Sequence, residues 1–140
     1  MLMEWTAEIV RGWPADGARE RAETIKAATT LVNGDVVEPQ ADGTVAKVGA
    51  TATKKAGLVV RGNGDSDSAK NSNKAVVLWG NYIVKTSNYA AGAYVPGSPV
   101  MAVNGEFALA NGTTDPEIGF VLQVVAASAT QTAHLVIAVY

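Results

Sequence analysis

LVNGDVVEPQADGTVAKV, residues 31–48, contains two short valine-rich runs separated by turn residues. Valine is stiff at its first side-chain torsion and fits the pleated, half-buried surface of a strand. Asn33-Gly34 and Asp42-Gly43 are pairs that readily adopt the positive φ angles of tight turns. The stretch therefore predicts short β-strands joined by tight turns.

The composition of the whole chain favours the same class. Its 140 residues include 19 Val and 12 Thr against 7 Leu, and 14 Gly and 5 Pro divide the chain into short runs. Strand-forming residues in short runs bounded by turn residues are typical of all-β domains. The length suits one domain, which we expect over residues 20–140. Gly12, Pro14 and Gly17 break regular structure in residues 1–19, which we expect to form an extended N-terminal arm.

The pattern of residues 31–48 occurs a second time, as YVPGSPVMAVNGEFAL over residues 94–109. Nine positions match when a single-residue gap is allowed: Val32, Gly34, Val37, Gly43, Val45, Ala46, Gly57, Leu58 and Val59 correspond to Val95, Gly97, Val100, Gly105, Phe107, Ala108, Gly119, Phe120 and Val121. Two similar halves, about residues 27–60 and 90–122, would explain the match. The alternative is that any two β-meanders share turn chemistry. A true repeat predicts a jelly-roll-like antiparallel β-sandwich.

Three further stretches carry structural expectations. Residues 75–86, AVVLWGNYIVKT, form two β-runs around Gly80-Asn81, which predicts either a tight hairpin or a glycine bulge in one long strand. The final run, AHLVIAVY, is apolar on both faces, so we expect a strand that is covered on both sides. Residues 61–74 are polar or small throughout and predict a solvated loop.

Charge and composition argue against several classes of function. The net charge is −2, from 11 basic and 13 acidic residues, and the basic block of a nucleic-acid binder is missing. No apolar stretch approaches the ~20 residues of a membrane-spanning helix, and MLMEWTAEIVRGW lacks the pattern of a secretory signal. The chain has no cysteine, which excludes disulfides and thiolate metal sites. We expect no cofactor and no direct contact with nucleic acid or membrane.

Few residues offer catalytic or metal-binding chemistry. His134 is the single histidine, and a lone histidine on an apolar strand is more often hydrogen-bonded or on the surface than catalytic. Asp65 and Asp67 alternate in a glycine-rich loop, as calcium ligands do, but the twelfth loop position is Val76 instead of an acidic residue. The sequence favours a solvated loop there and leaves cation binding open. It does not predict an enzyme.

Trp5 and Trp13 stand out because they lie in a terminal segment broken by glycine and proline. One alternative is that they fold back onto the domain. The other is that they anchor the arm on another chain, since Trp is over-represented among residues that dominate binding energy. A terminal arm can also add a strand to the sheet edge of a neighbour. We expect Trp5, Ile9 and Trp13 to contact a partner or a neighbouring subunit.

The motifs LVNGDVV, ADGTVAKV, AGLVV, AAGAYVPGSPV and EIGFVLQVV follow one another within about residues 20–140. In this order, and without cysteine, the chain resembles the small capsid cement, or decoration, proteins of tailed bacteriophages. The resemblance implies a structural protein on the outer surface of the virion, made in the cytoplasm of a bacterial host. It implies that the protein bridges neighbouring subunits of the major capsid protein. It also implies a homo-dimer or a homo-trimer, without deciding between them.

Two other functions stay open at this point. A β-sandwich often carries a carbohydrate-binding site, and Trp79, Tyr82, Tyr89 and Tyr94 are close enough in sequence to form an aromatic platform. An enzyme such as a small hydrolase is the less favoured alternative, because the chain offers one histidine, no cysteine and no evident carboxylate pair.

Overall fold

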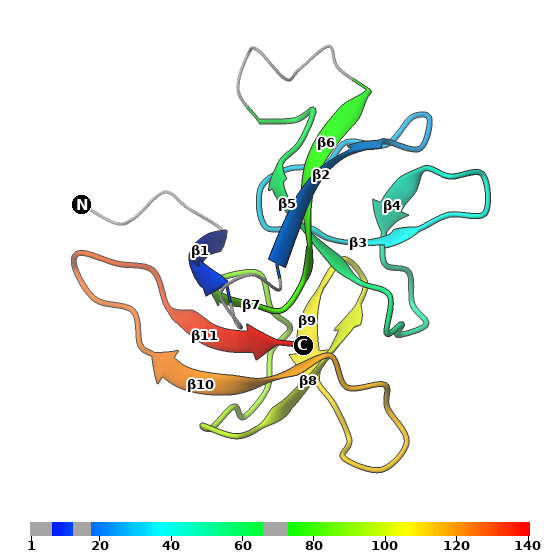
Figure 1. Cartoon of the computed structure of the whole chain (residues 1–140). Coiled ribbons are helices and arrows are strands. Elements are labelled where there is room, and N and C mark those ends of the chain that lie inside the picture. The colour runs from blue at the N-terminus through cyan, green and yellow to red at the C-terminus, as the bar shows by residue number, and fades with distance from the viewer. Residues whose placement is uncertain (1–6, 13–17, 66–72) are drawn as a thin grey trace.

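The computed structural model describes residues 7–12, 18–65 and 73–140 (Figure 1). Within these ranges the chain forms eleven β-strands and no helix, which confirms the predicted all-β class. The strands are β1 (Ala7–Gly12), β2 (Ala18–Thr24), β3 (Val36–Pro39), β4 (Val45–Lys47), β5 (Gly57–Arg61), β6 (Lys74–Gly80), β7 (Tyr82–Thr86), β8 (Pro99–Val103), β9 (Glu106–Leu109), β10 (Gly119–Val125) and β11 (His134–Val139).

The strands form two antiparallel sheets, as a β-sandwich requires. Sheet A has six strands in the order β1-β7-β11-β10-β8-β9, and sheet B has five in the order β2-β6-β5-β3-β4. In Figure 1 the long strands of sheet B run steeply across the direction of β10 and β11. The finer jelly-roll prediction is not confirmed by this order, because each sheet is assembled from one half of the chain, with β1 added to sheet A.

The two sheets contain the same five-strand pattern. The strands β2 to β6 have the same order in sheet B as β7 to β11 have in sheet A. Val37 pairs with Gly57 in sheet B, and the matching Val100 pairs with Gly119 in sheet A. Both β5 and β10 then carry a register shift at equivalent positions. The described structure therefore contains one five-strand unit twice.

The single-residue gap between the two sequence patterns falls in a turn. The β8–β9 turn passes through Asn104 and Gly105, which both have positive φ angles, 53° and 73°, as in a two-residue type I′ turn. In the β3–β4 turn the positive φ angle, 86°, is at Gly43, whose amide donates to the Gln40 carbonyl at 3.0 Å. This is a longer turn that ends in a glycine bulge. The strand register is kept while the turn length changes.

The chain crosses from sheet B to sheet A between β6 and β7. β6 ends at Gly80, whose φ angle is 96°, and β7 begins at Tyr82. Because β2 and β5 flank β6, and β1 and β11 flank β7, the two strands have no free edges with which to pair. The tight hairpin predicted for residues 75–86 is therefore wrong. The alternative, one long strand with a glycine bulge, is corrected to two strands that follow each other across Asn81 and belong to different sheets.

Two apolar clusters form the core. The larger one joins sheet A residues, including the fully buried Phe107, to Val36, Leu58 and Leu78 of sheet B. The smaller one lies on sheet B and comprises Ile25, Leu31, Val37, Val45, Val59, Ala75 and Val77, with Trp79 packed against it. All six residues of β11 are buried, as its two apolar faces predict.

The segment expected to be an arm, residues 1–19, contributes β1 to sheet A and the first two residues of β2 to sheet B. β1 pairs with β7 at one edge of sheet A, and β2 pairs with β6 at one edge of sheet B. Ala7 is buried in the larger cluster, and its amide donates to Oδ1 of Asn33 at 3.0 Å. Residues 7–12 are thus tied to the domain through backbone pairing and through packing at Ala7.

Candidate functional site

One of the three residues predicted to contact a partner lies in the described part of the chain. Ile9 belongs to β1, where its backbone pairs with Val84 of β7. Trp5 and Trp13 lie outside the described residues, so their contact with a partner stays a prediction. Because β1 is an edge strand of sheet A, Ile9 is at a position from which a backbone can pair with another chain.

The four aromatic residues considered as a carbohydrate platform do not share one surface. Tyr82 is 1% exposed and belongs to the core, where burial raises the pKa of its hydroxyl. Tyr89 and Tyr94 contact each other edge to face, with ring centroids 5.4 Å apart, and the Tyr94 hydroxyl donates to the Ala90 carbonyl. Trp79 packs instead against the sheet B cluster.

The single histidine is buried. His134 is 4% exposed at the start of β11, and its Nδ1 lies 3.0 Å from the Thr132 carbonyl oxygen. Among the described residues there is no group of three or more His, Asp or Glu side chains placed to hold a metal ion. The sequence reading of His134 as a hydrogen-bonded strand residue agrees with this placement.

The Asp65 side chain links the loop that contains Gly62 to the loop that contains Asn33. Its carboxylate accepts hydrogen bonds from the amide of Asn33, at 2.9 and 3.1 Å, and from the amide of Gly62, at 2.6 Å. Asp67, the other carboxylate weighed as a calcium ligand, lies outside the described residues. The carboxylate oxygens of Asp65 therefore already accept hydrogen bonds from backbone amides.

The described part of the polar loop is packed, not solvated along its length. The Leu31 amide donates to Oδ1 of Asn63 at 2.8 Å, and the Gly64 amide donates back to the Leu31 carbonyl at 2.9 Å. Gly62 is buried. The expectation of a solvated loop is thus wrong for residues 62–65, because its Asn and Asp side chains bind the backbone of the preceding loop.

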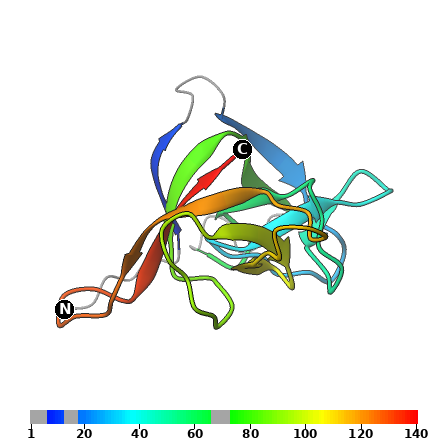
Figure 2. The ribbon, with the colours of Figure 1, turned by 90° about the horizontal axis from the view of Figure 1, so that it is seen from below.

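A candidate interaction surface lies along the outer part of β10. β10 pairs with β8 at Gly119 and Phe120, whereas its pairing with β11 continues to Val125. On the β8 side, the backbone of Val121 still hydrogen-bonds to Gly97 and Ser98, and no described strand pairs with residues 122–125. Leu122 and Val124, on this stretch, are 40% and 46% exposed. Figure 2 shows the ends of β10 and β11 projecting from the body of the molecule.

The exposed residues of this stretch carry no charge; they are the apolar Leu122 and Val124 with the polar Gln123 between them. The last charged side chain before β10 is Glu117, and no Asp, Glu, Lys or Arg occurs in residues 118–140. Val95, 60% exposed, lies in the turn whose Gly97 amide donates to the Val121 carbonyl beside the open edge. The uncharged run is visible in the sequence and is the signal that could have found this surface.

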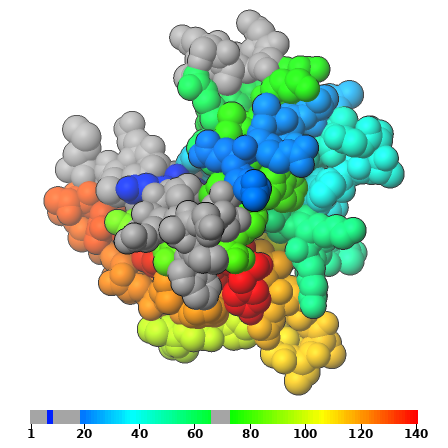
Figure 3. All heavy atoms as spheres, in the orientation of Figure 1, coloured from blue at the N-terminus to red at the C-terminus, as the bar shows by residue number. Residues whose placement is uncertain are grey.

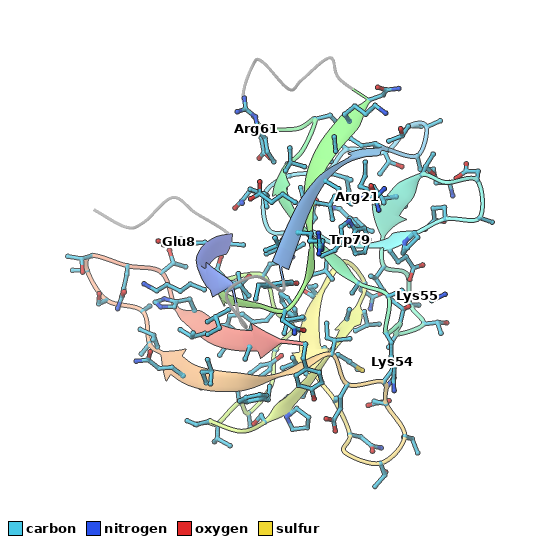
Figure 4. All side chains as sticks on the ribbon, in the orientation of Figure 1. Glu8, Arg21, Lys54, Lys55, Arg61 and Trp79 are labelled. Atoms are coloured by element: carbon cyan, nitrogen blue, oxygen red, sulfur yellow. The ribbon has the colours of Figure 1, made fainter. Side chains whose placement is uncertain are left out.

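A second candidate site is a cleft between the two halves. Its volume is about 400 Å³. Both sheets and the loop before β5 contribute to its lining, which consists of Pro39, Lys54, Lys55, Ala56, Trp79, Gly80, Ile118, Val139 and Tyr140. In Figure 3 the green-cyan surface of the loop before β5 stands near the red surface of the C-terminal residues. Figure 4 places the two lysines on this loop and Trp79 on β6.

Two of the residues that line the cleft, Trp79 and Tyr140, carry polar donor groups. The Trp79 Nε1–H is buried and has no hydrogen-bond partner among the described residues. The Tyr140 hydroxyl, in contrast, donates to Oε2 of Glu117 at 3.3 Å. Burial and the Glu117 carboxylate raise the pKa of the Tyr140 hydroxyl. Sequence reasoning missed this site because its lining comes from segments far apart in the chain.

No protein-family model matches the chain, and no curated protein sequence matches it either. Across residues 7–12, 18–65 and 73–140 there is no helix long and apolar enough to span a membrane.

Proposed function

We propose that this chain is a structural virion protein that binds the outside of a phage capsid and bridges neighbouring subunits of the major capsid protein. The observation that carries the proposal is the open, uncharged edge of β10, with Leu122 and Val124 exposed beside it. The resemblance to capsid cement proteins is the reason for proposing the major capsid protein as the partner. Neither feature requires a reaction centre.

The open edge is suited to binding another polypeptide. Unpaired backbone groups on a strand can accept a strand from a neighbour, while the flanking side chains supply apolar contact area. Proteins usually protect such edges with charges or proline, because an open apolar edge promotes association. From Gly119 to Val125 this strand has neither. A capsid subunit or a second copy of this chain would cover it.

Bridging follows from symmetric assembly. A homo-dimer or homo-trimer presents the same surface two or three times, and each contact after the first gains from a raised effective concentration. Many modest contacts can then hold the protein on a shell. Trp5, Ile9 and Trp13 form the second part of the proposed contact.

Co-sedimentation with expanded capsid shells that lack the protein tests the proposal. We expect saturable binding at a fixed ratio to the major capsid protein, and this ratio distinguishes a dimer from a trimer. The Val124→Glu variant places a charge at the apolar edge and is expected to weaken binding by about ten-fold or more, because an unpaired charge is costly to desolvate.

A control variant and a variant of the N-terminal contact make this test more specific. Ala41→Glu adds the same charge to an exposed turn of sheet B and is expected to bind normally. A Trp5→Ala/Trp13→Ala variant examines the N-terminal contact separately. Absence of binding by the folded wild-type protein would contradict the proposal, and a glycan array would then test the carbohydrate-binding alternative.

A further inference from the structure

We propose that Asn111 is a site of spontaneous deamidation, a covalent modification that the chain undergoes without an enzyme. In this reaction the backbone nitrogen of the next residue attacks the carbon of the side-chain amide. Glycine lacks the Cβ that hinders this attack, so an Asn-Gly pair is reactive in an unfolded chain. The sequence contains such pairs at residues 33–34, 63–64, 104–105 and 111–112. The folded structure restrains the first three and leaves the last one open. This site does not depend on the proposed capsid role.

The first pair, Asn33-Gly34, is held by hydrogen bonds on both reacting groups. The Asn33 side chain donates from Nδ2 to the Val60 carbonyl at 3.0 Å. The Gly34 nitrogen, which would have to attack, donates to the Val59 carbonyl at 2.9 Å. Both bonds must break before a ring can close between the two residues, so this pair reacts only after the loop opens.

The second pair, Asn63-Gly64, is restrained in the same way. The Asn63 side chain donates to the Thr29 carbonyl at 3.0 Å and accepts the Leu31 amide at 2.8 Å. The Gly64 nitrogen donates to the Leu31 carbonyl at 2.9 Å. The leaving group and the attacking group of this pair are therefore both engaged.

The third pair, Asn104-Gly105, forms the tight turn between β8 and β9, whose backbone is held at both residues. The Asn104 amide donates to the Gly49 carbonyl at 2.8 Å. The carbonyl of Gly105, which is buried, accepts the Val36 amide at 3.0 Å and Nδ2 of Asn88 at 2.9 Å. Ring closure rotates the peptide unit between the asparagine and the glycine, and this rotation would disturb these bonds.

The fourth pair, Asn111-Gly112, lies in the exposed turn that follows β9, and its reacting nitrogens are free. Residues 111–114 are all exposed. Within the described ranges, neither the Gly112 nitrogen nor Nδ2 of Asn111 has a hydrogen-bond partner. A Cβ added at Gly112 would meet nothing within 4 Å, so the backbone there has room to move. Attacking group and leaving group are thus both available.

The side-chain oxygen of Asn111, in contrast, accepts hydrogen bonds from three donors. The amide and the hydroxyl of Thr113 donate to Oδ1 at 2.8 and 2.7 Å, and the Thr114 amide donates at 3.2 Å. Attack on Cγ moves negative charge onto this oxygen, and donors already placed there stabilise such charge, as in an oxyanion hole. The Thr113 hydroxyl therefore assists the reaction.

The reaction balances with water as the co-reactant. The Gly112 nitrogen forms a bond to Cγ of Asn111, and the bond from Cγ to Nδ2 breaks. The proton lost by the Gly112 nitrogen passes through water to the departing nitrogen, which leaves as ammonia, and a cyclic imide remains. Water then opens the imide at one of its two carbonyls, which gives aspartate or isoaspartate. The product carries one added negative charge, so the net charge changes from −2 to −3.

Peptide mapping by tandem mass spectrometry tests the proposal on the full-length chain incubated at neutral pH. Cleavage after glutamate places Asn111 in the fragment 107–117. We expect deamidation at Asn111 to be at least about ten-fold faster than at the other three pairs, because these react only after local opening. In concentrated urea this advantage is expected to disappear, since all four pairs are then unfolded.

Three variants examine the chemistry of the turn. Gly112→Ala is expected to slow the reaction about ten-fold, because the added Cβ hinders the attack. Thr113→Val removes the hydroxyl donor and is expected to slow it about three-fold. Thr114→Val removes a neighbouring hydroxyl that does not bond to Asn111, and it is expected to react like the wild type.

Two outcomes would overturn the proposed site. One is that Asn111 stays intact in the folded protein while the urea-unfolded chain deamidates. The other is that Asn33, Asn63 or Asn104 reacts as fast as Asn111 in the folded protein. Equal rates in Thr113→Val and Thr114→Val would overturn the role of the Thr113 hydroxyl. Capsid binding plays no part in these outcomes.

Discussion

The strands β5 and β10 occupy equivalent places in the two halves, but their outer ends differ. After Arg61 the chain leaves β6, and residues 62–65 fold against Leu31 through side-chain and backbone hydrogen bonds. β10 instead stays paired with β11 to Val125 and leaves its other edge open. The same strand pattern therefore ends in a covered edge in one half and an exposed edge in the other. This difference identifies the outer end of β10 as a candidate interaction surface, which becomes evident when the two halves are compared.

The largest expected effect separates two equivalent glycines, Gly57 and Gly119. A Cβ at Gly119 would lie 2.2 Å from the Ala138 carbonyl oxygen, which belongs to the central strand β11 and cannot withdraw. At Gly57 the nearest atom is Cγ1 of the Val77 side chain, at 2.5 Å, which can shift. We expect Gly119→Ala to lower the free energy of unfolding by about 3 kcal/mol or more and Gly57→Ala by about 1–3 kcal/mol.

Urea denaturation of the two variants measures this difference. Equal losses of unfolding free energy would contradict this prediction. They would mean that the backbone of β11 shifts as easily as the side chains of sheet B, and that the two halves are equivalent in packing as well as in strand order. Gly112→Ala, where an added Cβ meets nothing within 4 Å, is the matched control.

Asn88 connects the two halves. Its Nδ2 donates to the carbonyls of Gly34 and Gly105, each at 2.9 Å, so one amide joins the turns of both units. The position that corresponds to Asn88 in the first half is Ile25, a buried apolar residue. We expect Asn88→Ala to reduce the free energy of unfolding by about 1–3 kcal/mol, because two carbonyls lose a donor.

Thermal unfolding monitored by circular dichroism tests the Asn88 prediction. Asn111→Ala removes an amide that hydrogen-bonds only within its own exposed turn, and it is expected to have a smaller effect. Two separate transitions in Asn88→Ala would show that the halves can unfold independently, whereas a loss no greater than that of Asn111→Ala would contradict the connecting role.

Much of the fold is predictable because it depends on local chemistry. Asn104-Gly105 and Asp42-Gly43 indicate turns in any context, and the two apolar faces of the last strand require cover on both sides. The crossing at Gly80 was not predictable, since a glycine marks a turn but not the sheet to which the next strand belongs. The cleft depends on tertiary placement, and neither Trp79 nor Tyr140 carries a local pattern that reveals it.

In the first half, the packing of residues 62–65 against the preceding loop depends on the side chain of Asp65. Its carboxylate accepts the amides of Asn33 and Gly62, and the second half has Pro96 in place of Asn33, which provides no amide. Asp65→Ala is expected to lower the free energy of unfolding by about 1–3 kcal/mol, because bonds to a charged acceptor are lost.

Hydrogen exchange reports the local consequence of Asp65→Ala. Exchange of the Asn33 and Gly62 amides is expected to accelerate, while exchange at Val124 stays at its wild-type rate. Unchanged protection of Asn33 and Gly62 would show that other contacts hold the covered edge.

The smallest expected effect concerns Asp35 and its equivalent, Ser98. In both turns a side-chain oxygen accepts a valine amide: Val32 donates to Asp35 at 2.8 Å, and Val95 donates to Ser98 at 3.0 Å. The first half thus has a carboxylate where the second has a neutral hydroxyl. Burial raises the pKa of Asp35 above its ordinary value of 3.8, although the Val32 amide and Lys47 act in the opposite direction.

A raised pKa in the folded state means that the folded protein holds this proton more tightly than the unfolded chain. The stability contributed by protonated Asp35 is therefore fully present below pH 3.8, the ordinary pKa, and is lost as the pH rises through the raised value. Asp35→Ser introduces the residue type that the second half has at the equivalent position, Ser98. The substitution keeps a side-chain oxygen as the acceptor in the turn. We expect the free energy of unfolding of the wild type, relative to Asp35→Ser, to decrease as the pH is raised from 3 through the raised pKa, as measured by urea titration. A difference that stays constant with pH would show that the carboxylate and the hydroxyl are equally well accommodated, and the two turns would then be equivalent in electrostatics as well as in geometry.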